Sequence, residues 1–327
     1  MKNAATINDV AKIAGVSKST VSRYLNGKPL KETTSIKIKE AIEKTNYQAN
    51  MFARLSAKKS YIIGIVVPGF DSTVNPRILT YVDKYLRNKN YTPLIINTED
   101  DMDFEARSIE NLASMKVDGI IVVASYITNK HKEVIKNIST PVIFLGQEFK
   151  EGISIVDDNY RAGFEFGKYV GKSGIKSVAC LWVDEKDIQV GKNRKKGVID
   201  GLKDEGVNNI SEKITDFSFN TSYKKAMEIL KEEKKVEAIM CATDRIAHGV
   251  YKACIELGLK IPEDVSVTGF GGYDSSEILT PPLTTIKFDV ETASFVCVDT
   301  ILKMTEDKPV SKKQVTGFKF IEGKSVK

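Results

Sequence analysis

Cationic and hydroxyl side chains gather between residues 18 and 23 of this 327-residue chain, in the stretch KSTVSR. A guanidinium such as that of Arg23 can donate two parallel hydrogen bonds to a guanine edge, and Lys18 can contact either a base or a phosphate. Ser19 lies beside them, and the hydroxyls of Thr20 and Ser22 suit phosphate oxygens. The chemistry that these residues could perform is therefore the recognition of DNA.

Two short helices joined by a tight turn must position these side chains. Thr6 and Asp9 have the spacing of a capping box, and apolar residues follow at helical spacing, which predicts a first helix. Gly15 permits the turn, and Ser17 is a suitable N-cap for a second helix over 18–25. The pattern predicts a helix-turn-helix, whose second helix enters the major groove and reads base edges.

A third helix completes the predicted headpiece. The segment TTSIKIKEAIEKTNY has Thr33 or Thr34 as a cap, apolar residues on one helical face, and Tyr47 near its end. We therefore predict an all-α headpiece over residues 1–47.

Residues 48–60 form a predicted linker, because this stretch has no strong cap and few apolar residues. It carries Arg54, Leu55 and several small residues. Either it folds when it touches DNA, with Arg54 and Leu55 near the minor groove, or it is a plain tether.

Positive charge is concentrated at the start of the chain. Residues 1–60 hold 12 Lys and Arg against 4 Asp and Glu, whereas the remainder holds 37 against 39. A basic segment beside a mildly acidic remainder favours a polyanionic partner for the N-terminal part. The alternative is that these cations lie on the solvated face of an ordinary helix. The helix-turn-helix pattern favours nucleic acid as the partner.

The sequence contains no segment typical of secretion or membrane insertion. Its start, MKNAATINDV, has no apolar run of signal-peptide length, and no stretch approaches the roughly 18 apolar residues that span a bilayer. The four cysteines lie in apolar stretches and are expected to be small buried residues. We expect a cytoplasmic protein without membrane contact, disulfide, metal or cofactor.

Residues 61–327 predict a two-lobed α/β domain for effector binding and dimerisation. Short apolar runs that helices separate are typical of parallel strands buried on both faces, and they occur in two sets. The expected strands lie at 61–68, 92–98, 119–125 and 141–146, then at 176–182, 237–243 and 263–272. Helices are expected near 190–205, 222–233 and 244–257, with a helix over 287–304 and a strand near Lys319 crossing back between the lobes.

Two facing lobes of this kind predict a cleft for a small molecule. Open α/β sheets bind ligands outside the carboxyl ends of their strands, so two doubly wound sheets facing each other enclose such a site. The predicted fold is therefore a helix-turn-helix headpiece followed by a two-lobed domain like that of periplasmic binding proteins.

Several motifs together resemble the lactose-repressor and purine-repressor family of bacterial transcription regulators. They are DVAKIAGVSKSTVSRYLNG, NYQANMFAR, VDGIIVVA, CATDRIAHGV, PEDVSVTGFGG and PPLTTIKFD. The segments GFGGYDSS and VDEKDIQVGKNRKKG are most similar to the sucrose and related disaccharide operon repressors of Gram-positive bacteria. The resemblance implies a homodimer on a pseudo-palindromic operator, a linker helix in the minor groove, and a sugar, sugar phosphate or nucleobase in the cleft.

The resemblance also implies which residues contact DNA. Lys18, Ser19 and Arg23 fall at the positions that discriminate bases. The linker departs from the usual Ala-Arg-x-Leu order, because Leu55 comes one residue early; we expect a rotated linker helix in which Leu55 still inserts, the alternative being a weaker wedge. The residues expected at the DNA are Thr6, Lys18, Ser19, Thr20, Ser22, Arg23, Asn26, Tyr47, Asn50, Arg54 and Leu55.

In the cleft, Arg194 falls at the family position that grips the ligand, and a guanidinium suits vicinal hydroxyls. Asp244 is expected either to close the cleft or only to cap a helix. Relatives often have Asp where this chain has Gly271 and Gly272, so hydrogen bonds must come from Tyr273 and Asp274 or from Asp184 and Asp187. The residues expected at the effector are Asp71, Ser72, Arg194, Phe217, Asp244 and Tyr273.

Enzyme and transport functions fit the sequence poorly. GKYVGKS has one residue too few for a phosphate-binding loop, no G-x-S-x-G is present, and His131 and His248 are the only imidazoles, which we expect to be ordinary helix or surface residues. A transport receptor would need a signal peptide and no headpiece. We expect a dimer without a coiled-coil tail. Binding of the effector is expected to change the affinity for DNA, and the effector acts either as an inducer or as a corepressor.

Overall fold

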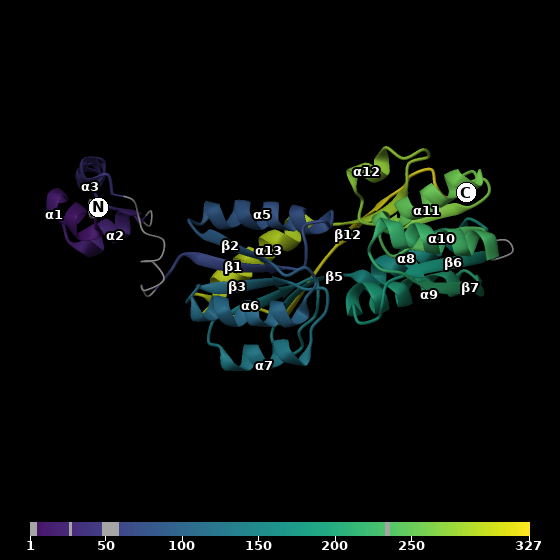
Figure 1. Cartoon of the computed structure of the whole chain (residues 1–327), viewed down its shortest axis with the longest axis horizontal. Coiled ribbons are helices and arrows are strands. Elements are labelled where there is room, and N and C mark those ends of the chain that lie inside the picture. Colours follow the sequence, from purple (N-terminus) through teal and green to yellow (C-terminus); the bar gives the residue numbers. More distant parts are fainter. Residues whose placement is uncertain (1–4, 26–27, 48–58, 233–235) are drawn as a thin grey trace.

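The computed structural model describes residues 5–25, 28–47, 59–232 and 236–327. They form a helical headpiece and two α/β lobes, the N-lobe and the C-lobe (Figure 1). Of the predicted linker, only Lys59 and Ser60 are described, so the expectations for Asn50, Arg54 and Leu55 lie outside these residues, as does that for Asn26. No helix among the described residues is long and apolar enough to cross a membrane.

The headpiece contains helices α1 (Ile7–Ala14), α2 (Lys18–Leu25) and α3 (Glu32–Thr45). The predicted capping box of α1 is confirmed, since the Asp9 carboxylate accepts hydrogen bonds from Thr6 N and Thr6 Oγ1 at 2.8 and 2.7 Å. Gly15 adopts φ 64°, which a residue with a Cβ resists. These features fix the turn that sets α2 across α1.

The buried core of the headpiece is small. It consists of Val10, Ala11, Ala14, Val21, Ile38 and Ala41. The predicted cap of the third helix is wrong: the N-cap is Lys31, whose carbonyl accepts from Thr34 N and Ser35 N at 2.9 and 3.0 Å. Thr33 and Thr34 therefore lie inside the first turn, because the extended backbone at Lys31 already starts the helix.

The N-lobe is built on a parallel sheet with strand order β11-β5-β4-β3-β1-β2. Helices α5 (Val74–Asn88) and α13 (Val290–Met304) cover one face, and α6 (Met102–Ser114) and α7 (Asn129–Asn137) cover the other (Figure 1). The strands are β1 (Ile62–Val67), β2 (Thr92–Asn97), β3 (Gly119–Val123), β4 (Val142–Leu145), β5 (Ile153–Asp157) and β11 (Lys313–Thr316).

The C-lobe is built on a second sheet with strand order β12-β10-β9-β8-β6-β7, parallel except for the antiparallel pair β10 and β12. Its strands are β6 (Ser177–Trp182), β7 (Asn209–Ile214), β8 (Ala238–Cys241), β9 (Ser266–Phe270), β10 (Thr284–Phe288) and β12 (Phe318–Ile321). Its helices are α8 (Asn159–Lys172), the π-helix η1 (Ile188–Arg194), α9 (Lys195–Asp204), α10 (Phe219–Glu232), α11 (Asp244–Leu257) and the short α12 (Asp274–Glu277). The two predicted doubly wound sheets are therefore present.

Glycines bring α8 and α9 unusually close together. A Cβ at Gly163 would lie 2.3 Å from Arg194 O, and one at Gly197 would lie 2.1 Å from Tyr160 O. Because both clashes involve backbone atoms, neither helix could carry a larger residue there without moving. This packing fixes the end of η1, from which Arg194 projects.

The chain crosses between the lobes after β5, after β10 and between β11 and β12. The predicted final crossing is therefore confirmed, but the predicted helix over 287–304 begins only at Val290, because β10 occupies the preceding residues. The helix expected near 190–205 begins as η1. Four strands were not predicted, and two of them, β7 and β11, are partly exposed edge strands without an apolar run.

Candidate functional site

Helix α2 presents a face of cations and hydroxyls. Val21 is fully buried against the headpiece core, whereas Lys18, Ser19 and Arg23 are exposed. Ser17 Oγ lies 2.7 Å from Ser19 Oγ and accepts from Thr20 N at 3.2 Å, so it orders the first turn as the predicted cap. An exposed N-terminal turn of this composition can contact base edges in a major groove.

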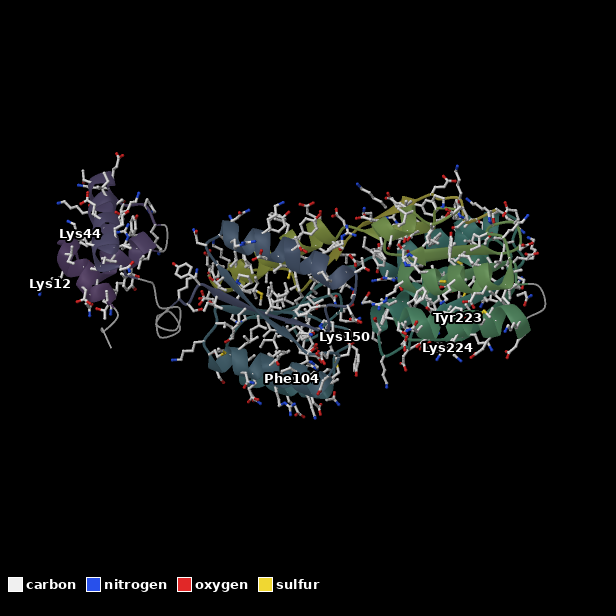
Figure 2. All side chains as sticks on the ribbon, turned by 45° about the horizontal axis from the view of Figure 1, so that its top comes forward. Lys12, Lys44, Phe104, Lys150, Tyr223 and Lys224 are labelled. Carbon is white, nitrogen blue, oxygen red and sulfur yellow. The ribbon has the colours of Figure 1, made fainter. Side chains whose placement is uncertain are left out.

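Other expected DNA contacts have roles inside the headpiece. Arg23, which is exposed, donates from Nη2 to Pro29 O at 3.0 Å, and this bond uses one of its five N–H groups. The Thr6 hydroxyl is held by Asp9, and Tyr47 packs against the headpiece core. Figure 2 shows further cations of the headpiece, Lys12 and Lys44, on α1 and α3.

The end of the linker that enters the N-lobe is fixed by contacts that the sequence did not predict. We call the residues that make these contacts the linker joint: Lys59, Ser60, Tyr61, Tyr91 and Asp118. The Asp118 carboxylate accepts from Ser60 N, Ser60 Oγ and Tyr61 N at 2.7, 2.8 and 2.9 Å. Lys59 Nζ lies 5.5 Å from the ring centroids of both Tyr61 and Tyr91. Tyr61 has φ 57°, an unusual conformation for an aromatic residue, which the three bonds of Asp118 hold in place.

A cavity of about 510 Å³ lies between the two lobes, at the carboxyl ends of their strands. Both lobes line it, as the doubly wound folds predict. Of the residues expected at the effector, the cavity is lined by Asp71, Ser72, Arg194, Phe217 and Tyr273. Asp187 also lines it, whereas Asp184 and Asp274 are exposed residues outside the lining.

Arg194 is held rigidly at the wall of the cavity, with only 6% of its surface exposed. Its Nε and Nη2 donate to Asn159 Oδ1 at 2.9 and 2.7 Å, and Nη1 donates to Ala242 O at 2.7 Å. The rings of Phe270 and Phe288 lie 4.8 and 4.9 Å from the guanidinium carbon. Since an arginine has five N–H groups, one remains on each Nη for a ligand.

Two carboxylates lie within electrostatic range of Arg194, that of the buried Asp187 and that of the partly buried Asp157. Asp187 accepts from Gln147 Nε2 at 2.6 Å and from Val190 N at 2.8 Å, and Asp157 accepts from Thr316 Oγ1 at 2.7 Å. Burial raises the pKa of both carboxyls, and the charge of Arg194 opposes that rise. Burial also lowers the pKa of Arg194, to about 10, so its guanidinium stays charged at neutral pH.

Asp244 has neither of its expected roles. It is fully buried and does not line the cavity, and the cap of α11 is Thr243, whose side chain accepts from Ile246 N at 3.3 Å. The Asp244 carboxylate instead accepts from Tyr273 N, Ser276 Oγ and Thr285 Oγ1 at 3.0, 2.9 and 2.5 Å. It therefore positions the loop that carries Tyr273.

The glycine pair before Tyr273 makes that loop possible. Gly271 and Gly272 have φ 150° and 59°, and a Cβ at Gly271 would lie 2.4 Å from the Tyr273 ring. The turn replaces the Asp expected from relatives with a phenol that lines the cavity. Tyr273 is 6% exposed, whereas Phe217 is 41% exposed and offers a ring face at the cavity edge.

Two interlobe contacts flank the cavity. Gln147 of the N-lobe donates to Asp187 of the C-lobe, and Arg245 of the C-lobe donates from Nη1 to Asp71 O of the N-lobe at 2.5 Å. Ser72 Oγ accepts from Val74 N at 3.1 Å, at the start of α5. Cavity residues that the sequence did not single out include Arg77, Gln147, Asp157, Asn159, Gln189 and Arg245. Gln147, Asp157 and Asn159 lie at the end of a strand or within two residues of it, which is the local signal that they carry.

Both histidines lie in helices, as expected, His248 in α11 and His131 in α7. His131 is fully buried, with Nε2 3.0 Å from Glu105 Oε1 and Nδ1 2.8 Å from Thr128 Oγ1. Burial raises the pKa of the Glu105 carboxyl. His248 Nε2 lies 3.1 Å from Ser276 Oγ, beside the partners of Asp244.

Comparison with known proteins gives matches over the headpiece and the lobes. Residues 6–50 match a family model described as bacterial regulatory proteins, lacI family, and residues 168–326 match a periplasmic binding protein-like domain. The chain is 36% identical to the sucrose operon repressor of Staphylococcus xylosus, over 96% of this chain and 97% of that protein. It is 28% identical to the ribose operon repressor of Halalkalibacterium halodurans, over 93% and 92%.

The fold is also similar to that of a solved structure of a lac repressor dimer bound to operator and the anti-inducer ONPF. The TM-score is 0.87 at 24% identity, and the match covers 98% of each chain. The match includes both lobes and the headpiece, so the whole architecture is shared.

Proposed function

Because this chain belongs to the lacI family of bacterial regulatory proteins, we propose that it represses a sugar-utilisation operon. Members of this family bind DNA to regulate transcription, and the chain is a regulator and not an enzyme. Its operator affinity changes when a sugar or sugar phosphate binds in the interlobe cavity. We place it in the cytoplasm, as a homodimer on a pseudo-palindromic operator.

The observation that carries the sugar proposal is the chemistry around Arg194. Its guanidinium keeps two N–H groups for a ligand and lies within electrostatic range of the carboxylates of Asp157 and Asp187, so this part of the lining offers both donors and acceptors. Phe217 offers a ring on which the apolar face of a sugar can stack. Vicinal hydroxyls, each donor and acceptor, match such a lining, and the sucrose and ribose operon repressors are relatives of this chain.

On the DNA side, the exposed face of α2 supports base readout by Lys18, Ser19 and Arg23. Thr20 and Ser22 are proposed phosphate contacts, with Thr6 and Tyr47 at the edge of the same surface. Asn26, Asn50, Arg54 and Leu55 remain proposals from the sequence. One headpiece covers few bases, and a two-fold pair doubles the contacts.

Effector and operator are proposed to be linked through the angle between the lobes. A ligand in the cavity contacts both lobes, so it favours one lobe arrangement, and the linker joint passes that arrangement to the linker. By linkage, effector and DNA then change each other's affinity by equal factors. A sugar that induces lowers the affinity for the operator.

The proposal is tested by fluorescence anisotropy on DNA from upstream of the protein's own gene and its neighbours. Sucrose, other disaccharides, fructose and sugar phosphates are titrated into the protein–DNA complex. We expect specific binding that one of these sugars weakens. Specific binding that no sugar changes, or that only a nucleobase such as hypoxanthine strengthens, would overturn the sugar effector, and no specific binding would overturn the repressor.

A further inference from the structure

Two loops of the N-lobe that line the cavity are tied to each other both at the cavity and inside the lobe. The loop after β2 contributes Asp100 to the lining, and the loop after β3 contributes Ser125. At the cavity, Ser125 Oγ donates to Asp100 Oδ1 at 3.0 Å. Inside the lobe, the two helices that these loops enter are joined by His131 of α7 and Glu105 of α6, whose Nε2 and Oε1 atoms are 3.0 Å apart. The proposed sugar site gives this inner pair no role.

The loop of Asp100 has an unusual backbone that neighbouring bonds must hold. Glu99 and Asp100 have φ 52° and 59°, which few residues with a Cβ adopt. Asp100 N donates to Pro68 O at 2.9 Å, and Glu105 N donates to Asp101 O at 2.8 Å in the first turn of α6. Glu105 therefore lies one helical turn from the loop, and a contact that fixes Glu105 also fixes the end of the loop.

His131 does the same for the loop of Ser125. It lies in the first turn of α7, and its Nδ1 accepts from the N-cap residue, Thr128 N, at 3.2 Å. Because a backbone N–H can only donate, Nδ1 carries no proton, and the proton of the imidazole is on Nε2. His131 is therefore neutral, and its Nε2 donates to Glu105 Oε1.

The carboxyl of Glu105 is fully buried, and so is the imidazole of His131. Glu105 Oε2 has no hydrogen-bond partner among the residues that the structure describes. Burial raises the pKa of the Glu105 carboxyl, and the charge of Asp100 adds to that rise, whereas the hydrogen bond from His131 opposes it. A protonated Glu105 fits this environment, because an ionised carboxylate would leave a buried charged oxygen bare.

The charged groups that face the pair do not compensate an ionised Glu105. They are Asp100 in the loop after β2, Asp103 on α6 and Lys130 on α7. Lys130 Nζ lies 2.6 Å from Asp103 Oδ2 at the surface, where both side chains are more than half exposed. On the side of the sheet, the ring of Phe144 packs 6.5 Å from the ring of His131 and is apolar. The nearest compensating cation therefore already has a partner.

We propose that Glu105 and His131 are a positioning pair for the cavity, and that they hold the loops of Asp100 and Ser125 together only while Glu105 keeps its proton. This inference rests on the proposed function, since the same cavity is proposed to bind the sugar. Loss of the proton leaves a buried carboxylate, which the protein relieves by loosening the first turns of α6 and α7.

The direction of the pH dependence follows from the burial of Glu105. Its pKa in the folded protein lies above that in the unfolded chain, so the folded protein holds the proton more tightly. The stabilisation by the pair is therefore complete at low pH and is lost as the pH rises through the pKa of the folded protein. Sugar binding should weaken over the same range of pH, because the two loops then separate more easily.

The test compares the full-length protein with Glu105→Gln, whose amide oxygen still accepts from His131 and whose side chain cannot lose a proton. Hydrogen–deuterium exchange of residues 98–105 and 124–131 is measured at about pH 5.5 and about pH 8.5, with the two proteins compared at the same pH. We expect equal exchange at the lower pH. At the higher pH, the unmodified protein should exchange about threefold or more faster than Glu105→Gln.

Fluorescence anisotropy at the same two pH values connects the pair to the cavity. The half-release concentration is the concentration of sugar that frees half of the protein from its operator. At the higher pH, that of the unmodified protein should exceed that of Glu105→Gln about threefold, and at the lower pH the two should agree.

The matched control is Lys130→Met, which removes the exposed ion pair with Asp103 between the same two helices. It should behave as the unmodified protein does at both pH values. His131→Gln keeps a donor for Glu105 but lacks the nitrogen that accepts from Thr128 N, so residues 124–131 should exchange faster at both pH values. Thermal unfolding checks that each variant is folded.

Two results would overturn the inference. One is equal exchange of the unmodified protein and Glu105→Gln at the higher pH, and the other is a difference in exchange without a difference in half-release, which would make the pair a support of the helices alone. If no sugar releases the protein from its operator at either pH, the sugar proposal fails, and the exchange of the two loops still decides whether the pair holds them together.

Discussion

The exposed face of α2 that we propose to contact DNA, which we call the DNA face, and the interlobe cavity each centre on an arginine, and the two arginines are held in opposite ways. Arg23 is exposed and donates one hydrogen bond, to Pro29 O. Arg194 is 6% exposed, donates three hydrogen bonds and lies near two aromatic rings, Phe270 and Phe288. We therefore expect DNA to order the side chains of the DNA face, whereas the side chain of Arg194 is already held in place by its contacts within the protein.

This difference predicts where substitutions act. A side chain on the DNA face has few internal partners, so its loss should change binding and leave folding intact. A side chain at the cavity shares its contacts with the core of the lobe, so its loss should change stability, ligand binding or both. Four substitutions can break or sharpen this contrast.

The largest effect is expected at Asp244, which supports the cavity without touching it. Asp244→Asn keeps the shape but places an amide N–H₂ against the buried donors that the carboxylate now satisfies. We expect the free energy of unfolding of the C-lobe to fall by about 3 kcal/mol. Urea unfolding followed by Trp182, the single tryptophan, which is fully buried in the C-lobe, measures this loss.

The control for Asp244 is Asp274→Asn, because Asp274 directly follows Tyr273 and is exposed at the start of α12. It should change the free energy of unfolding by less than about 0.5 kcal/mol. An equal, small effect of both substitutions would show that the Asp244 hydrogen bonds do not hold the loop.

Asp244 also shows why the headpiece was easier to predict than the cavity. The exposure of a residue on α2 depends on neighbours three or four positions away, so the spacing of apolar residues predicts which side chains face outward. The partners of Asp244 lie 29, 32 and 41 positions along the chain. No local pattern contains them, and so the carboxylate was expected either to close the cleft or only to cap a helix.

The strands also show that the sequence predicts features with a local apolar pattern and misses those without one. Buried strands such as β1 and β3 are continuous apolar runs, and the sequence predicts them closely. Edge strands β7 and β11 are bound on one side only and carry polar residues, so they lack that signal. The linker joint was missed because Asp118 and Ser60 are 58 positions apart.

A second prediction tests whether Arg194, the rigidly held arginine of the cavity, binds the effector. Arg194→Met should abolish the response to sugar, with at least a hundredfold rise in the half-release concentration, as for the loss of two charge-assisted hydrogen bonds. Operator affinity without effector should stay near normal, because Arg194 lies far from the headpiece in sequence and is buried between the lobes. Fluorescence anisotropy measures both quantities.

Arg161→Met is the control for Arg194, because Arg161 is an exposed arginine of the same lobe, paired with Glu165. It should respond to sugar as the unmodified protein does. A normal response of Arg194→Met would show that the cavity has been assigned to the wrong ligand.

The third prediction concerns the exposed arginine. Arg23→Ala should weaken specific operator binding by roughly 1–3 kcal/mol per headpiece, the value of one bidentate base contact. The salt-dependent binding to unrelated DNA should change little, and the unfolding of the lobes should not change at all. Anisotropy on operator and on scrambled DNA, over a range of salt concentrations, separates the specific from the non-specific affinity.

Lys44→Ala is the matched control, since Lys44 is an exposed cation of the headpiece on α3 (Figure 2). Its loss should leave the ratio of specific to non-specific affinity unchanged. If Arg23→Ala weakens both kinds of binding equally, Arg23 contacts a phosphate, and base readout falls to Lys18 and Ser19.

The smallest effect is expected at the linker joint, which connects the two regions. Asp118→Asn replaces one of the two oxygens that accept from Ser60 and Tyr61 with an amide N–H₂, at a cost of about 1 kcal/mol. Sugar binding by calorimetry should be unchanged, whereas the ratio of operator affinities without and with sugar should fall about fivefold. Asp103→Asn, at an exposed ion pair with Lys130 in the same lobe, should leave that ratio intact. An unchanged ratio in Asp118→Asn would mean that the linker joint does not transmit the effect of sugar binding to the DNA face. Tyr61 would then hold its strained conformation without the carboxylate.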